Sequence, residues 1–382
     1  MAPRGANALQ TLDALIHTAS ELLTQLQSAL SELQSNPASQ QHSSPVDPTI
    51  NALSLAHDSA SLIRAHGTKI SLLIINEPFT PSAISTVLRE LIAGPIPGLA
   101  SSAQACTSAE YTEVIRVELA SKARRVLSEL SELIQKIPRD GKVLSKGSSR
   151  SGFAPGEKGS LPATGLLWAA CDEIISLSKL GVRGVFAKKM DQWRDTLCDI
   201  MEELKDWGDE EPEDDDDDDD ADDDHDDVDD LANNLTATSL SPQALLDQIM
   251  NSQPPIPKSD PHGIRPRLET SLRRLRLVTL LFQALLKHRL KNLPSFPAAA
   301  APSSSIAPRL DEMANRLGTL PDRFGDLACA FYELQPHEID RVMDQCFGDA
   351  SDAASLFVQN WEGETDTFSE WLVRFRGEMK KA

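Results

Sequence analysis

The sequence lacks the motifs on which most enzymes and membrane proteins depend. It contains no Gly-x-x-x-x-Gly-Lys-Ser/Thr phosphate loop, no Gly-x-Ser-x-Gly turn, and no two histidines spaced as metal ligands. No segment reaches the roughly 18 consecutive apolar residues of a membrane span. Aromatic residues make up only 5% of the chain, which favours helical bundles over sheets. We therefore expect a protein that is not an enzyme, with no cofactor, no metal site and no membrane span.

The five cysteines form no recognisable disulfide or metal-binding framework. They are odd in number, scattered, and never spaced as Cys-x-x-Cys. This pattern is typical of free thiols in a reducing compartment, and the first ten residues lack the apolar run of a signal peptide. We therefore expect a soluble intracellular protein. Because no histidine is placed to activate Cys171, we interpret it as a buried core thiol.

The net charge of −21 comes almost entirely from one acidic tract. Residues 209–230 hold 18 acidic side chains, so the rest of the chain carries only about −3. So dense a run of carboxylates cannot fold alone, and we expect a disordered linker over 208–259, interrupted by a short helix at 242–250.

The acidic tract has two interpretations that the sequence leaves open. It either attracts basic proteins such as histones or ribosomal proteins, or it is a solvated spacer between two domains. Direct nucleic-acid binding by the tract is excluded, because phosphates would be repelled. The residues that would carry an electrostatic interaction are Asp214, Asp215, Asp216, Asp217, Asp218, Asp219 and Asp220.

The N-terminal half is predicted to form long helices with matching apolar seams. Residues 6–34 repeat apolar side chains at spacings of three and four, as coiled coils do. Such a helix either dimerises or packs within its own bundle, and the matching seams that follow favour the bundle. Three further helices are expected: one capped by Asp47 with Pro48 in its first turn, one from Thr80-Pro81 to Gly94, and one over 99–137. The connecting segments 36–46 and 138–163 are expected to be mobile loops.

Two more helices precede the acidic tract. The fifth begins at Thr164 and ends near Gly181, and the sixth ends at Trp207-Gly208. Trp168 and Trp193 fall in apolar stripes, which predicts core packing. Trp207 lies beside the acidic run and is the better candidate for exposure.

After the tract, the chain is predicted to form a second helical region. A basic amphipathic helix spans 264–291, a Pro/Ala/Ser-rich loop covers 294–308, and shorter helices follow near 309–317, 321–333, 336–347, 350–360 and 366–378. The basic helix could contact DNA or a membrane surface, but its apolar stripe is continuous. We therefore interpret it as a bundle helix whose basic residues extend outward, some toward the acidic tract. The predicted architecture is two all-α, up-and-down helical domains, 6–207 and 260–378.

Two short segments resemble a known family. Thr164-Gly165, Trp168 and Ala170-Cys171-Asp172 match its Thr-Gly-x-x-Trp-x-Ala-Cys-Asp segment. Asp326-Leu327-Ala328, followed by Tyr332 and Pro336, is similar to a second pattern of the same family. The family is that of the cyclin-D-interacting proteins, GCIP, and the chain resembles a fungal member. Ten of the eleven motif positions are candidates for a structural or interface role: Thr164, Gly165, Trp168, Ala170, Cys171, Asp172, Asp326, Leu327, Tyr332 and Pro336.

The resemblance implies a helix-rich, non-enzymatic protein related to the talin and I/LWEQ type of bundle. Members of the family bind D-type cyclins and adaptor proteins, act in cell-cycle or transcriptional control, and occur in cytoplasm and nucleus. The leading hypothesis is therefore an adaptor that binds cyclin-like or transcription-regulating proteins. The alternatives are an acidic chaperone or assembly factor for basic proteins, and a talin-like cytoskeletal adaptor.

Overall fold

The computed structural model describes residues 3–35, 51–144, 160–210, 253–297 and 306–379. Every regular element in these ranges is a helix, which confirms the predicted all-α class. Within them, no helix is long and apolar enough to cross a bilayer. The predicted helix start at Asp47 and Pro48, the acidic residues 214–220 and the helix at 242–250 lie outside the described residues, as do the loop 36–46 and most of 138–163.

The chain forms two compact units that do not follow chain order. Unit 1 comprises Met1–Lys189 and His288–Asn315, and unit 2 comprises Met190–Lys287 and Arg316–Ala382. The predicted domains, 6–207 and 260–378, are sequential. Here residues 190–207 group with the C-terminal helices, and residues 288–315 group with the N-terminal helices. The long helix α7 (Leu161–Asp209) contributes residues to both units.

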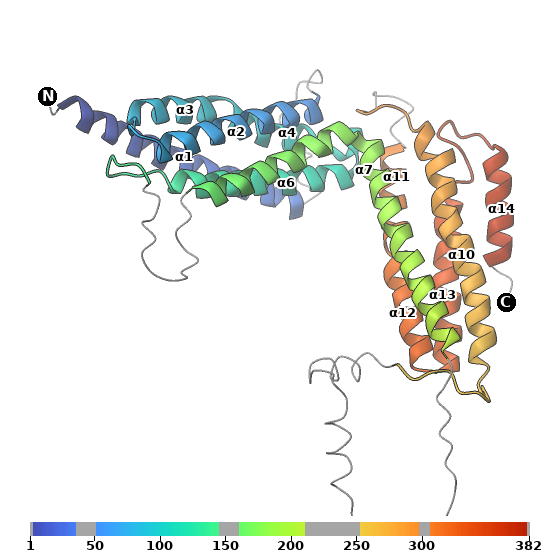
Figure 1. Cartoon of the computed structure of the whole chain (residues 1–382). Helices are drawn as coiled ribbons and strands as arrows, with labels where there is room; N and C mark the ends of the chain where they lie inside the picture. The colour runs from blue at the N-terminus through green and yellow to red at the C-terminus, as the bar shows by residue number, and fades with distance from the viewer. Residues whose placement is uncertain (1–2, 36–50, 145–159, 211–252, 298–305, 380–382) are drawn as a thin grey trace, which may run out of the picture. The chain divides into compact units, whose positions relative to one another are not determined.

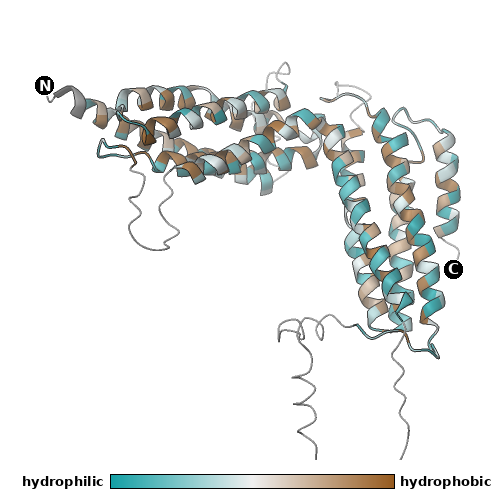
Figure 2. Cartoon of the chain, viewed as in Figure 1, coloured by the Kyte–Doolittle hydropathy of each residue, from teal (hydrophilic) through white to brown (hydrophobic). Residues whose placement is uncertain are grey.

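Unit 1 is a bundle of long helices that pack along their apolar sides. Its elements are α1 (Pro3–Ser35), α2 (Ala52–Ile75), α3 (Pro81–Ala93), α4 (Pro95–Ala105), α5 (Ser108–Tyr111), α6 (Glu113–Gln135), the first part of α7, the 3-10 turn η2 (Leu290–Asn292) and most of α11 (Ile306–Gly318). Both α1 and α2 contact α3, α4 and α6 (Figure 1). The predicted seam of α1 is covered inside this bundle, since Leu12, Ile16 and Leu23 are at most 2% exposed. Apolar and polar residues alternate around the helices accordingly (Figure 2).

The predicted helix over 99–137 is wrong, because the chain breaks it twice. It forms α4, the single turn α5 and α6, separated at Cys106-Thr107 and at Thr112. Thr112 has a φ of 101°, a left-handed conformation that side-chain-bearing residues seldom adopt. Distant contacts support this break: the Tyr111 hydroxyl accepts a hydrogen bond from the Ala52 amide at 3.1 Å.

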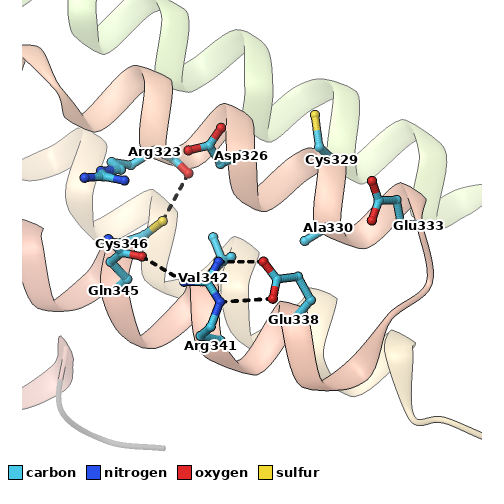
Figure 3. A pocket seen from close by; sticks show the side chains of 10 residues that line it. All are labelled: Arg323, Asp326, Cys329, Ala330, Glu333, Glu338, Arg341, Val342, Gln345 and Cys346. Carbon is cyan, nitrogen blue, oxygen red and sulfur yellow. Dashed lines mark hydrogen bonds and ion pairs between the residues drawn. The ribbon is translucent and has the colours of Figure 1, made fainter.

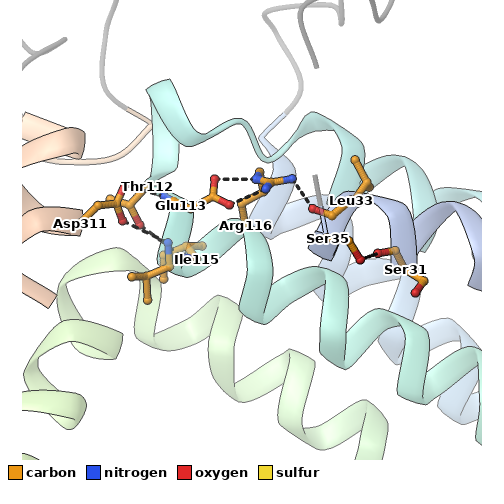
Figure 4. Close-up of polar contacts among 9 residues, drawn as sticks. Ser31, Leu33, Ser35, Thr112, Glu113, Ile115, Arg116 and Asp311 are labelled. Atoms are coloured by element: carbon orange, nitrogen blue, oxygen red, sulfur yellow. Dashed lines mark hydrogen bonds and ion pairs between the residues drawn. The ribbon is translucent and has the colours of Figure 1, made fainter. Parts of the chain in front are cut away.

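The first turn of α6 is capped from α11, nearly 200 residues away. The Asp311 carboxylate accepts hydrogen bonds from the Glu113 amide at 2.7 Å and the Val114 amide at 3.1 Å (Figure 4). Thr112 Oγ1 accepts from the next amide, that of Ile115, at 3.3 Å. Three amides that a helix leaves without intrahelical partners are thereby satisfied. Burial raises the pKa of Asp311, and the two amide hydrogen bonds oppose that rise.

We expect Asp311→Ala to lower the free energy of unfolding by about 1–2 kcal/mol, as other lost N-caps do. The two amides of α6 would lose their acceptors, so chemical denaturation of the full chain should show a lower midpoint. Asp206→Ala is the matched control, because Asp206 is exposed on α7. Equal midpoints for the two variants would show that the cap from α11 contributes nothing.

Arg116 is one of the two fully buried arginines of unit 1, and it joins α6 to α1. It is 1% exposed, its Nε donates to Glu113 at 2.8 Å, and its Nη2 also contacts that carboxylate. Its Nη1 donates to the Leu33 carbonyl at 2.6 Å, in the last turn of α1 (Figure 4). A buried guanidinium therefore satisfies a carbonyl that the end of α1 would otherwise leave without a partner. The Glu113 hydrogen bond raises the pKa of Arg116, so the group stays charged.

His66 is buried on α2 beside α3. It is 9% exposed, its Nδ1 has no hydrogen-bond partner among the described residues, and Glu90 Oε2 lies 3.5 Å away. Burial is the main cause that lowers its pKa, Lys69 lowers it further, and Glu90 partly opposes them.

Unit 1 should therefore lose stability as pH falls through about 6.5, the ordinary histidine value. Below that pH the unfolded chain takes up a proton that folded His66 resists, so the unfolded state gains stability. Chemical denaturation at pH 7.5 and 5.0 should show a smaller loss for His66→Phe than for the native chain. A loss of the same size would contradict the assignment, and His17→Gln, at an exposed position of α1, is the control.

Gly181 kinks α7 within its unit 1 part. Its φ of 62° and ψ of −175° are non-helical, and a side chain there would be strained whatever the space around it. The helix end predicted near Gly181 corresponds to this kink. The next helix continues without a gap, because only this residue departs from helical geometry.

Unit 2 consists of the second part of α7, α10 (Ile264–His288), α12 (Leu320–Tyr332), α13 (Pro336–Ser355) and α14 (Thr367–Met379). The core is aromatic, with Phe324 and Phe347 edge-to-face at 5.3 Å between ring centroids. The predicted separate helices 336–347 and 350–360 are wrong, because α13 is continuous through Gly348 to Ser355.

Candidate functional site

The candidate site lies on unit 1, where the first turns of α7 cross α2. The two helices approach closely at Gly67, because a Cβ there would lie 2.5 Å from the Leu167 side chain. The Ser71 and Ser160 hydroxyls form a buried hydrogen bond of 3.1 Å at the start of α7. These contacts hold the two helices together and position the motif that begins at Thr164.

The motif divides into a buried and an exposed half. Thr164, Ala170 and Cys171 are at most 3% exposed and pack into the bundle with Leu167. Gly165, Trp168 and Asp172 face outward. Spacings of three and four place these three residues on one side of α7.

The indole of Trp168 lies over α2 rather than in the core. Its Nε1 donates to Thr68 Oγ1 at 3.0 Å, and the Arg64 guanidinium lies 5.4 Å from the ring centroid. Arg64 Nε also lies 3.2 Å from Asp172 Oδ1. Both partners come from α2, so a cation–π contact and a hydrogen bond fix the ring in one orientation. Trp168 is still 37% exposed.

The predicted core packing of Trp168 is therefore wrong. The buried seam of α7 runs through Ala163, Leu167, Ala170, Ile174 and Leu177, so the neighbour of Trp168 takes the inward position. The sequence offers two adjacent apolar residues, and only packing against α2 decides which one turns inward. Cys171 is buried as predicted, and burial raises the pKa of its thiol to about 12.

Two exposed leucines extend this surface. Leu72 follows Thr68 by one turn on α2 and is 52% exposed, and Leu161 precedes Trp168 by two turns on α7 and is 64% exposed. The two helices are antiparallel, because residues 64, 68 and 71 of α2 contact residues 172, 168 and 160 respectively. Leu72 and Leu161 therefore lie at the same position along the helix pair. Together these residues form the Trp168 surface: Arg64, Thr68, Leu72, Leu161, Gly165, Trp168 and Asp172.

No contact within the described bundle requires a glycine at position 165. A Cβ built at this position meets nothing within 4 Å, and the residue is helical. Glycine inside a helix costs about 1 kcal/mol relative to alanine, so the fold alone would favour alanine here. The missing side chain leaves a flat area beside Trp168 that a partner could approach closely.

The opposite side of α7 is fixed to α6 by ion pairs. Glu173 accepts from Lys122 at 3.2 Å and from Arg125 at 2.6 Å, and Lys189 lies 3.5 Å from Glu118. The Trp168 surface is thus presented by a helix held on both sides. Arg64, Thr68 and Leu72 were not predicted from the sequence, although their spacing of four, outside the apolar seam of α2, indicates one outward side of that helix.

The second motif lies in unit 2 and has mainly structural contacts. Leu327 and Ala328 are buried, Asp326 is exposed, and Pro336 starts α13. The Tyr332 hydroxyl donates to Glu203 at 2.9 Å, and burial raises the pKa of Tyr332.

Trp207 is buried beside Tyr332, and its predicted exposure is wrong. It is 4% exposed, stacks edge-on against Tyr332 at 5.3 Å, and donates its Nε1 hydrogen to the Pro254 carbonyl at 3.2 Å. These partners are distant in sequence, so the adjacent acidic run was a misleading guide to exposure.

A groove of about 390 Å³ lies between α12 and α13, and several of its side chains bond to one another or to the backbone (Figure 3). Its Arg341 is engaged by Glu338 and Gln345, and the Cys346 thiol donates to the Arg323 carbonyl at 3.1 Å. Burial raises the pKa of Cys346 to about 12, so this thiol stays protonated at neutral pH. Nor do the described residues contain a cluster of three or more His, Cys, Asp or Glu placed to hold a metal ion.

Fold and site together define an all-α bundle protein whose candidate site is an exposed helical surface. Residues 56–210 match the model of the family described as Grap2 and cyclin-D-interacting, N-terminal. This part of the chain, which carries the Trp168 surface, is similar to that family, and the resemblance predicted from the sequence is confirmed. The match ends before Asp326, so the second motif stays a prediction.

A relative in fission yeast shares part of this sequence. An uncharacterized protein of Schizosaccharomyces pombe is 27% identical over 164 residues, which cover 43% of this chain and 46% of the relative. The alignment therefore spans less than half of either protein.

Proposed function

We propose that this protein is a non-enzymatic adaptor that binds a regulatory protein of cyclin type through the Trp168 surface. By this proposal it modulates cell-cycle progression or transcription in the cytoplasm and nucleus. The observation that carries the proposal is the outward half of the motif: an exposed tryptophan, held in place by α2, within the segment that matches a cyclin-D-interacting family.

The chemistry of the surface suits protein recognition. Tryptophan and arginine dominate the energetics of many protein interfaces, and both are present at its centre. The Thr68 hydrogen bond and the Arg64 contact order the indole before binding, which reduces the entropy lost on association. Leu72 and Leu161 add exposed apolar area at one end of the surface.

A purified D-type cyclin is the direct probe of this proposal. We expect the full chain to bind it, and a variant with Asp214 through Asp220 changed to asparagine to bind equally well, because the proposed surface lies on folded helices. Binding that disappears in the neutralised variant would transfer the interaction to the acidic tract. No binding to the full chain would remove the cyclin-type partner.

One observation favours a second function, the binding of basic proteins. The last turns of α7 line an acidic groove of about 600 Å³, and the acidic tract follows α7 directly in the sequence. Asp199, Glu202 and Asp206 line it. A histone-tail peptide should then bind the native chain and lose affinity in the neutralised variant, with strong dependence on salt.

A further inference from the structure

Helix α10 of unit 2 carries more positive charge than its own bundle uses. Arg265 donates to the Gly208 and Ile256 carbonyls at 3.1 and 3.2 Å, and Arg267 pairs with Asp340 at 2.7 Å. Arg274 is buried, donates to the Met379 carbonyl and lies over the Phe347 ring at 4.1 Å. Three arginines are therefore committed to packing.

Three further cations form a row on the outer side of the same helix. Arg273, Arg276 and Lys287 are exposed, and no ion pair joins their side chains to another residue that the structure describes. Spacings of three and eleven residues place them on one side of α10, with the 42% exposed Leu280 between them. We name Arg273, Arg276 and Lys287 the α10 basic stripe.

The ends of the acidic segment are fixed at the start of this helix. Arg265, in the first turn of α10, holds the Gly208 carbonyl, and Trp207 holds the Pro254 carbonyl. The two described residues that flank the acidic segment, 210 and 253, therefore both lie near the N-terminus of α10.

The lengths match. Residues 214 to 220 follow residue 210 by four to ten positions, which is about 13 to 33 Å of extended chain. The three cations lie about 14, 18 and 35 Å along the helix axis from Ile264. An extended chain of this length spans the axial distance from the start of α10 to Arg273 and Arg276, so the densest negative charge of the sequence lies within reach of the stripe.

We propose that the α10 basic stripe is the docking surface of the chain's own acidic segment, centred on residues 214–220. A single exposed ion pair contributes at most about 1 kcal/mol, but the tether gives the segment an effective concentration near the millimolar range. Many carboxylates face three cations, so the contact is electrostatic and tolerant of register. A basic protein that binds the acidic segment would have to compete with the α10 basic stripe for the same carboxylates.

Zero-length carbodiimide coupling of carboxylates to amines tests the contact in the full chain. The R273K/R276K variant keeps the charge of the stripe and supplies two additional amines beside Lys287. We expect cross-links within one molecule between residues 211–230 and the stripe at 50 mM salt, and their loss at 500 mM salt. Lys205 and Lys258 are the proximity controls, because they flank the segment outside the stripe. Cross-links confined to these two lysines would overturn the proposal.

A competition measurement provides the second test, with a labelled synthetic peptide of residues 213–230 as the probe. A neutralised variant with every Asp and Glu of residues 211–230 changed to asparagine or glutamine should bind this peptide at least about tenfold more tightly than the native chain, because its stripe is vacated. Adding R273E/R276E/K287E should abolish that binding, with helicity checked by circular dichroism. Equal binding by the native and neutralised chains would refute the proposal. So would a neutralised chain that prefers duplex DNA or phosphatidylserine vesicles to the peptide.

Discussion

Arg116→Met is expected to lower the free energy of unfolding by about 3 kcal/mol, the lower end of the range for breaking a buried ion pair. The change removes the only described donor to the Leu33 carbonyl and leaves Glu113 without its guanidinium partner. Glu113 is 33% exposed and can regain water, which is why the lower end applies. Chemical denaturation of the full chain, followed by circular dichroism, measures the change.

The same helix offers a matched control. Arg124 lies two turns further along α6 and is exposed, so Arg124→Met should change the free energy of unfolding by no more than about 0.5 kcal/mol. Removing both charges in E113L/R116M should recover part of the loss, because an apolar pair does not leave a buried charge unpartnered. If Arg116→Met and Arg124→Met unfold at the same denaturant concentration, the buried pair does not stabilise the junction of α1 and α6.

Trp168→Ala is expected to weaken binding of a D-type cyclin by about 30-fold or more, the effect of losing an interface hot spot. The variant should remain folded. It loses one hydrogen bond to Thr68 and the contact with Arg64, which together contribute about 1–2 kcal/mol. Isothermal titration with the native and variant chains measures the affinity, and thermal unfolding monitors the fold.

Leu166→Ala is the control for this prediction. Leu166 is 51% exposed on α7 but belongs to the other side of the helix, two residues before Trp168. Its removal should leave the affinity unchanged within a factor of about two. Equal losses in the two variants, or none in either, would mean that the Trp168 surface is not where the cyclin binds.

The helical class and most of the helices of unit 1 could be predicted from apolar spacing alone. The seams of α1 and α2, the start of α3 at Pro81 and its end at Gly94 are all local features of the sequence. The division of 99–137 was not predictable in the same way. It depends on Tyr111 reaching Ala52 and on Asp311 reaching α6 from far along the chain.

The candidate site was found from the sequence in part. The motif positions were identified, but the predicted exposure of two tryptophans was wrong. Trp168 was predicted to be buried and is exposed, whereas Trp207 was predicted to be exposed and is buried. For Trp168 the periodic pattern could not distinguish adjacent residues, and Leu167 takes the inward position against Gly67. For Trp207 the deciding neighbours are Phe331 and Tyr332, more than 120 residues away. Side-chain exposure at such positions is a property of helix packing, which local spacing does not determine.

Hydrogen–deuterium exchange of the full chain, with and without a bound D-type cyclin, tests the central claim most directly. We expect added protection in two peptides, residues 61–75 of α2 and 161–175 of α7, with little change in α1 or unit 2. Protection confined to α1, to unit 2 or to the acidic tract, with these two peptides unchanged, would contradict it.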